Sequence, residues 1–175
     1  MPGPRLRSPR LELIAADSES SRLALFDRGF FARWLDAKVS AEWPHESMSA
    51  ALEACSHDLI AKPELSGWLH WHFIWIEGIQ RTLVGDGGFK GPPDRNGRVE
   101  IGYAVLGPFE GRGFASEAVG ELTAWAFADP RVTAVEAETF VDNTASLRVL
   151  HKNGFRRLRP ALGDGFVILE RSRSE

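Results

Sequence analysis

The sequence predicts an α+β fold with a mixed, mostly antiparallel central sheet flanked by helices. Two runs rich in aromatic and β-branched residues, 68–76 and 82–89, are joined through Glu77-Gly78, which indicates an antiparallel hairpin. Further along the chain, a long helix-like run separates two strand-like runs, and a crossover of this kind makes its strands parallel. One parallel pair is therefore expected within the sheet.

The segment before the hairpin predicts one strand and three helices. Residues 1–9 are polar, basic and proline-bearing, and we expect a flexible N-terminal arm there, followed by a single domain over residues 10–175. Leu11–Ile14 is a short first strand. Trp43-Pro44 interrupts the helical pattern and is expected to lie in a loop. The expected helices cover residues 18–27, 30–38 and 48–62.

The segment after the hairpin predicts the crossover and the closing strands. A central strand is expected over residues 98–106. The long helix starts near Gly113 and ends before Pro130, and Val132–Thr139 is the strand parallel to the central one. The remaining elements are a helix over residues 143–153, stopped by Gly154, and two strands over residues 155–159 and 166–171.

Composition and charge narrow the class of protein. The chain has 175 residues, of which 43% are hydrophobic and 26% charged, and this length and amino-acid composition are typical of one globular domain. A net charge of −3 argues against a nucleic-acid binder, because such binding depends on Lys and Arg against phosphates. No apolar run reaches the ~18 residues of a membrane span, and Met1–Arg10 lacks the apolar core of a signal peptide, so a cytoplasmic location is expected.

The turn between the central strand and the long helix has the residues of an anion-binding loop. Its sequence is Pro108-Phe109-Glu110-Gly111-Arg112-Gly113-Phe114-Ala115. Glycine reaches positive φ without steric cost, so successive N–H groups can converge on one point, and the positive end of the following helix adds to their effect. We therefore expect a phosphorylated ligand at this turn.

Spacing separates three kinds of phosphate turn. A P-loop needs a lysine that this turn lacks. The Gly-x-Gly-x-x-Gly fingerprint of dinucleotide-binding enzymes fits only loosely, since Ser116 stands at the third glycine position. The third pattern, Gln/Arg-x-x-Gly-x-Gly/Ala, is met at Gly113 and Ala115, with Glu110 in place of its first residue.

Two flanking segments carry the same resemblance as this turn. Glu100-Ile101-Gly102-Tyr103-Ala104-Val105 precedes the turn, and an Asn-x-x-Ser-x-Arg-x-Leu-x-Lys-x-Gly-Phe pattern runs from Asn143 to Phe155. Over roughly residues 80–160, the chain resembles the GNAT superfamily of acetyl-CoA-dependent N-acetyltransferases. It is similar to the branch that includes the ribosomal-protein N-terminal (alanine/serine) acetyltransferases.

The resemblance implies a three-layer α/β arrangement in which the two parallel strands splay apart and acetyl-CoA is bound between them. Pantetheine then bonds to the backbone of the strand before the turn, and the pyrophosphate lies on the N–H groups of the turn. Arg148 and Lys152 contact the ribose phosphate, or only solvate their helix face. The implied cofactor-binding residues are Tyr103, Ala104, Val105, Leu106, Glu110, Gly111, Arg112, Gly113, Phe114, Ala115, Asn143, Arg148 and Lys152.

The resemblance also implies the catalytic residues. Transfer to an amine needs a neutral nitrogen and a proton for the leaving thiolate. Glu100 is the expected base, acting through water, while an ion pair with Arg98 or a neighbour is the alternative use. Leu150 stands where many members of the family carry a tyrosine acid, so Ser146 is the expected proton donor. Asn143 either contacts the pantetheine arm or an ordered water, or caps its helix.

The amine acceptor is expected on the other side of the splayed strands, over the N-terminal helices. The helical spacing of Phe30 and Trp34 fits burial in the core equally well. An aromatic rim around an acidic mouth suits a peptide N-terminus, a polyamine or an aminoglycoside. The expected acceptor contacts are Phe26, Phe30, Trp34, Trp43 and Glu100, with Trp43-Pro44 as a lid.

Several features leave other uses open. His70 and His72 share one face of their strand at a spacing that suits a metal, but exposed histidines or acceptor contacts are favoured, and no metal is expected.

The resemblance is compatible with a homodimer. Glu110 and Leu150 suggest a CoA-binding sensor or interaction module without turnover as the alternative function. A nucleotide-dependent reductase would use the same turn for NAD(P)H.

Overall fold

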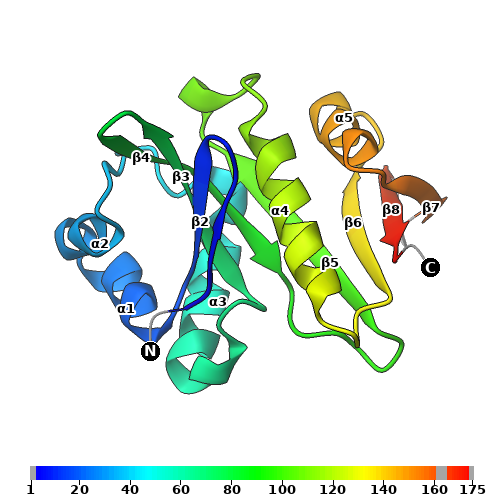
Figure 1. Ribbon diagram of the computed structural model, residues 1–175, viewed down its shortest axis with the longest axis horizontal. Helices are drawn as coiled ribbons and strands as arrows, with labels where there is room; N and C mark the ends of the chain where they lie inside the picture. The colour runs from blue at the N-terminus through cyan, green and yellow to red at the C-terminus, as the bar shows by residue number, and fades with distance from the viewer. Residues whose placement is uncertain (1–2, 161–164, 174–175) are drawn as a thin grey trace.

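The computed structural model of the chain describes residues 3–160 and 165–173, and its framework is one eight-stranded sheet (Figure 1). The order across the sheet is β1-β2-β3-β4-β5-β6-β8-β7. The strands are β1 (Arg5–Arg7), β2 (Leu11–Ala15), β3 (His70–Glu77), β4 (Gln80–Phe89), β5 (Arg98–Val105), β6 (Ala134–Phe140), β7 (Arg156–Pro160) and β8 (Phe166–Ser172). The helices are α1 (Ser18–Phe26), α2 (Arg28–Leu35), α3 (Ser49–Ala61), α4 (Phe114–Ala128) and α5 (Thr144–Lys152), with short 3-10 helices η1 (Glu46–Met48), η2 (Pro63–Leu65) and η3 (Gly107–Phe109).

The predicted mixed sheet is confirmed, because all neighbouring strands run antiparallel except β5 and β6. α4 provides the crossover between these two strands. Their parallel pairing begins at Arg98 with Ala134 and ends at Glu100 with Glu136. β5 continues to Val105 and β6 to Phe140 without pairing to each other, so the strands diverge.

One face of the sheet is covered by α4 and α5. In Figure 1, α4 crosses in front of the sheet and α5 lies beside β6. The main core cluster lies here and joins Trp71 and Phe73 of β3 to Val99 of β5, Leu122 of α4 and Leu150 of α5. Odd-numbered residues of β5 therefore face α4 and α5.

The opposite face is covered by α1, α2 and α3. A second core cluster on this face packs Phe31 and Leu35 of α2 and Leu52 of α3 against Ile14 of β2 and Ile74 of β3. These helices cover the N-terminal half of the sheet. On the diverging ends of β5 and β6, the same face of the sheet stays exposed at residues 102, 138 and 140.

Part of the expected N-terminal arm is a strand. Arg5–Arg7 form β1, which pairs antiparallel with β2 at the edge of the sheet. Polar composition predicted a flexible arm, but Arg5 and Arg7 lie 3.4 and 3.6 Å from the buried carboxylate of Glu12, and these charges favour the pairing. The domain limits otherwise stay a prediction. Within the described part of the chain, no helix has the length and apolar content needed to cross a bilayer.

Candidate active site

A groove of about 720 Å³ opens where β5 and β6 separate. Residues 101–105 of β5 and 137–140 of β6 form its two walls. The turn before α4 and the first turns of α5 line it on one face of the sheet, and residues at η1 line it on the other. The groove therefore passes through the sheet, in the place where the resemblance implied a splayed pair.

The backbone of β5 directs alternate groups into the groove. The carbonyl of Glu100 accepts the N–H of Lys90 at 3.0 Å, and the N–H of Leu106 donates to Val84 at 2.8 Å. Even-numbered residues of β5 thus bond toward β4, and the alternating residues Tyr103 and Val105 present N–H and carbonyl groups to the groove. Leu106, expected to contact the cofactor, is instead buried, and its backbone N–H bonds to Val84 of β4.

The turn before α4 presents unpaired backbone N–H groups to the groove. Gly111 and Gly113 have φ of 70° and 84°, a left-handed conformation that favours glycine. Across the described chain, the N–H groups of residues 111–116 donate to no protein acceptor, and the positive end of α4 lies at the same point. Glu110 is an exception among the expected donors, because its N–H donates to Gly107 at 3.2 Å.

Arg10 fixes this turn from the start of β2. Its Nη1 donates to the carbonyl of Arg112 at 2.9 Å, and its Nε donates to Glu117 in the first turn of α4 at 2.8 Å. Burial alone would raise the pKa of Glu117, but hydrogen bonds from Ser8 and Arg10 lower it. The guanidinium of Arg112 lies 4.3 Å from the ring centre of Trp75, outside the groove, so Arg112 offers only its backbone.

Three polar side chains meet at the start of α5. Asn143 caps this helix, since its side chain accepts the N–H of Ser146 at 3.0 Å, and both residues line the groove. The Ser146 hydroxyl lies 3.0 Å from the hydroxyl of Tyr103 on β5. Burial raises the pKa of Tyr103 to about 12, so its hydroxyl keeps its proton at neutral pH. Arg148 also lines the groove, whereas Lys152 does not.

Glu100, the expected base, lies outside this groove. Its carboxylate forms an ion pair with Lys90 and lines a separate hollow together with Arg98 and Glu136. The reason is the register of the parallel pair, because β5 and β6 are still joined at Glu100 and separate only after it. Glu100 therefore forms an ion pair, as in the alternative use given for it above, and its partner is Lys90.

The aromatic residues expected to bind the acceptor do not line the groove either. Phe26 and Phe30 are exposed on α1 and α2, with the guanidinium of Arg33 4.0 Å from the Phe30 ring centre. Trp34 is partly buried against the second core cluster. Trp43, expected in a lid, is buried and stacks on Phe31 with ring centres 4.7 Å apart. These residues belong to the layer over β2 to β4, which ends before the groove.

A different set of side chains lines the groove on the α1–α3 face. His45, Ser47 and Met48 come from η1 and the residue before it. On the other side of the opening, Glu138 lines the groove from β6. Phe140 and Phe166 add an aromatic pair with ring centres 4.1 Å apart.

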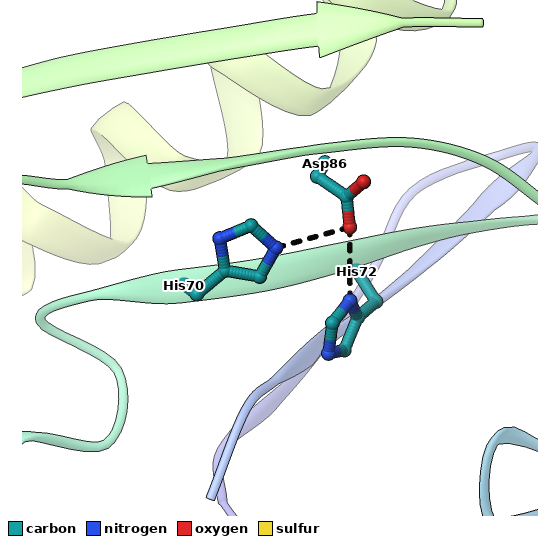
Figure 2. Close-up of side chains that lie close together, drawn as sticks. All are labelled: His70, His72 and Asp86. Carbon is teal, nitrogen blue, oxygen red and sulfur yellow. Dashed lines mark hydrogen bonds and ion pairs between the residues drawn. The ribbon is translucent and has the colours of Figure 1, made fainter. Parts of the chain in front are cut away.

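His70 and His72 point into the protein interior (Figure 2). They bond to Oδ1 of Asp86 on β4 at 3.1 and 2.9 Å. The expectation of exposed histidines or acceptor contacts is wrong, because this face of β3 packs beneath Phe31 and Trp43. Burial lowers the pKa of His72. Burial alone would raise the pKa of Asp86, but the two histidine bonds lower it to about 2.

The same three residues offer possible metal ligands. Their donor atoms lie within 4.8 Å of one another. Both imidazoles, however, converge on one carboxylate oxygen rather than on a common point between three ligands (Figure 2). The arrangement is a hydrogen-bond network as it stands, and the lack of a metal site stays a prediction.

The sequence did not single out His45 and Glu138, which line the groove, or the buried carboxylate of Asp86 as site residues. Glu138 had a usable signal, because along β6 it alternates with the apolar Ala137 and belongs to the exposed series. His45 directly follows the Trp43-Pro44 pair, for which the sequence predicts a loop near the acceptor. Asp86 is a lone charge in the glycine-rich end of β4, and its partners come from other elements.

Comparisons with known proteins indicate one family. The family model described as "Acetyltransferase (GNAT) domain" matches residues 10–156. The uncharacterized N-acetyltransferase YjdG of Bacillus subtilis (strain 168) is 28% identical over 151 residues, which is 86% of this chain and 84% of that protein.

Solved structures share the fold over nearly the whole chain. The ribosomal-protein-S5-alanine acetyltransferase from Vibrio fischeri has a TM-score of 0.63 at 14% identity, over 97% of this chain and 96% of that chain. The microcin C7 self-immunity acetyltransferase MccE, solved in complex with acetyl-CoA and AMP, has a TM-score of 0.63 at 17% identity, over 95% and 94% of the two chains. At these identities the likeness concerns the fold alone.

Proposed function

This chain belongs to the GNAT family of N-acetyltransferases, which use acetyl-CoA, and we propose that it transfers the acetyl group directly to a primary amine, of a peptide or of a small molecule, that enters the groove from the α1–α3 face. Donor and acceptor would then approach the reacting carbon from opposite sides of the sheet. No acetylated residue of the enzyme is needed as an intermediate.

The observation that carries this proposal is a groove lined from both faces of the sheet, with the unpaired N–H groups of residues 111–116 on the α4–α5 face. The N–H groups of residues 111–116 suit a diphosphate, and the unpaired edge of β5 at Tyr103 and Val105 suits the amides of pantetheine. On the other face, Glu138 offers a carboxylate to a cationic amine.

The groove residues supply the proton transfers that the reaction requires. When bound, acetyl-CoA supplies a thioester whose carbonyl carbon forms the new C–N bond as its C–S bond breaks and the sulfur keeps the electron pair. Glu138 takes the proton that the amine loses, through a water molecule. Ser146 gives its hydroxyl proton to the sulfur and takes one from Tyr103, 3.0 Å away, which solvent replaces.

Two substitutions by glutamine test which carboxylate acts as the base. Glu138→Gln is expected to lower kcat/KM by about tenfold or more, because general-base assistance is lost. Glu100→Gln, the matched control on the neighbouring strand, is expected to stay within about threefold of wild type between pH 6 and pH 9, because Glu100 lies outside the groove. Steady-state kinetics of thiol release decide the matter, and the reverse ranking would restore Glu100 as the base.

The activity itself is tested with acetyl-CoA and a panel of peptides, amino-acid amides, alkylamines, polyamines and aminoglycosides. Release of free thiol shows turnover, and a gain of one acetyl group by mass identifies the acceptor. Acetylation of at least one amine is the expected result. Tight CoA binding without thiol release across the panel would favour the sensor function instead.

A further inference from the structure

We propose that His45 binds the amine acceptor by donating a hydrogen bond from Nε2 to an oxygen atom beside the reacting nitrogen, and that Asp86 positions His45 through Trp43. The inference rests on the proposed function, because it concerns the acceptor of that reaction.

His45 lies where the acceptor is proposed to enter. His45, Ser47 and Met48 form the lining of the groove at η1, which we call the acceptor wall. Glu138 lines the same groove from β6. An acceptor that enters from this face therefore meets an imidazole as well as a carboxylate.

The bonds of the His45 ring identify which nitrogen is available. The backbone N–H of Ser47 donates to Nδ1 at 3.2 Å, and the Ser47 hydroxyl lies 2.8 Å from the same atom. A backbone N–H can only donate, so Nδ1 is the acceptor nitrogen and the neutral ring carries its hydrogen on Nε2. Nε2 bonds to no protein group in the described chain. The Nε2–H of His45 can thus donate a hydrogen bond to a ligand.

Trp43 anchors the acceptor wall to the sheet. Its indole Nε1 donates to Oδ2 of Asp86, and its ring stacks on Phe31. Its carbonyl accepts Nη1 of Arg28 at 2.7 Å. Because His45 follows two residues later, the side chain and backbone of Trp43 together restrict where the imidazole can lie.

Asp86 is itself held rigidly. His70 and His72 of β3 both bond to its Oδ1 (Figure 2). Its Oδ2 accepts the indole N–H of Trp43. The whole network is buried, and a buried carboxylate that loses a donor is costly. If Trp43 moved away, the buried carboxylate of Asp86 would lose a donor. The network therefore holds Trp43 in place, and the acceptor wall with it.

The chemistry of this wall indicates a class of acceptor. A donor at Nε2 has a partner only if the acceptor carries an oxygen close to its amine, as an α-amino amide does. A simple alkylamine has no such oxygen and would leave the donor to water. We therefore expect His45 to distinguish two acceptors that differ only in a carboxamide.

The test compares phenylalanine amide with 2-phenylethylamine, which has the same skeleton without the carboxamide. His45→Ala is expected to raise KM for the amide about tenfold, the effect of one hydrogen bond, and to change KM for the amine less than twofold. The dissociation constant for acetyl-CoA should not change. His57→Ala, an exposed histidine on α3, is the matched control and should behave as wild type.

Trp43→Phe tests the anchor, because it keeps an aromatic ring on Phe31 and removes the N–H. It should raise KM for the amide with little change in kcat, and the double variant with His45→Ala should be no worse than His45→Ala alone. If Trp43→Phe does not fold, Arg28→Ala, which removes the bond to the Trp43 carbonyl, takes its place.

The outcomes separate this inference from the proposed function. If no amine of the panel is acetylated, the proposed function fails and the inference fails with it. If amines are acetylated but His45→Ala affects both phenyl acceptors equally, or if only oxygen-free amines react, the inference alone is overturned. Additive effects of Trp43→Phe and His45→Ala would overturn the role of Asp86 and Trp43.

Discussion

Replacing Gly113 by valine is expected to weaken acetyl-CoA binding by about 5-fold to 150-fold, equivalent to about 1–3 kcal/mol. Gly113 has φ of 84°, which a β-branched residue adopts only with strain. A Cβ there would also lie 3.3 Å from Nη2 of Arg10, the residue that holds the turn. Strain and displacement of Arg10 both disturb the N–H groups proposed to hold the diphosphate.

Gly78→Val is the matched control for this experiment. Gly78 also has positive φ, at 60°, but it lies in the β3–β4 turn and a Cβ there would meet no atom within 4 Å. Both variants carry a strained residue, so they should lose comparable backbone stability in thermal unfolding. Titration calorimetry with acetyl-CoA should separate them. A folded Gly113→Val variant that binds as tightly as wild type would contradict the role of the turn.

Replacing Ser146 by alanine is expected to lower kcat by about 100-fold, because the leaving sulfur would lose its proton donor. The substitution keeps the backbone N–H that Asn143 caps, so α5 should remain intact. Tyr103→Phe removes the second hydroxyl of the pair and should lower kcat by about tenfold. Neither change should raise KM for acetyl-CoA more than about threefold.

The coupling between the two hydroxyls is the decisive part of this prediction. If Tyr103 acts through Ser146, the double variant should be no slower than Ser146→Ala alone. Ser172→Ala on β8, an exposed serine, serves as the control. Tyr103 is the only tyrosine in the chain, so a single ring signal in carbon-13 NMR reports its hydroxyl. Additive losses in kcat, or wild-type turnover by Ser146→Ala, would contradict the proposed proton transfer.

Features that depend on neighbouring residues were predictable from the sequence. The turn at Gly111–Gly113 lies between the central strand and the long helix, as glycine spacing indicated. The helical cap at Asn143 was an explicit alternative, and its side chain does bond to Ser146. The hairpin of β3 and β4 and the crossover through α4 were predicted for the same reason, since local pattern decides them.

Features that depend on pairing between distant segments could not be predicted from the sequence. The resemblance implied Glu100 as the base because of its place on the strand before the turn. The point where β5 and β6 separate, however, depends on the register of Glu100 with Glu136. Trp43 next to proline suggested a surface loop. Its burial depends on Asp86, 43 residues away, which no local pattern indicates.

The most direct test of cofactor binding at the turn before α4 is the response of the backbone N–H signals to acetyl-CoA in nitrogen-15 NMR. We expect the largest shifts on residues 111–116 and a second set at Tyr103 and Val105, because these backbone groups lie at the groove without a protein partner in the described chain. Saturable binding that leaves the signals of residues 111–116 unmoved, with shifts elsewhere, would contradict cofactor binding at this turn.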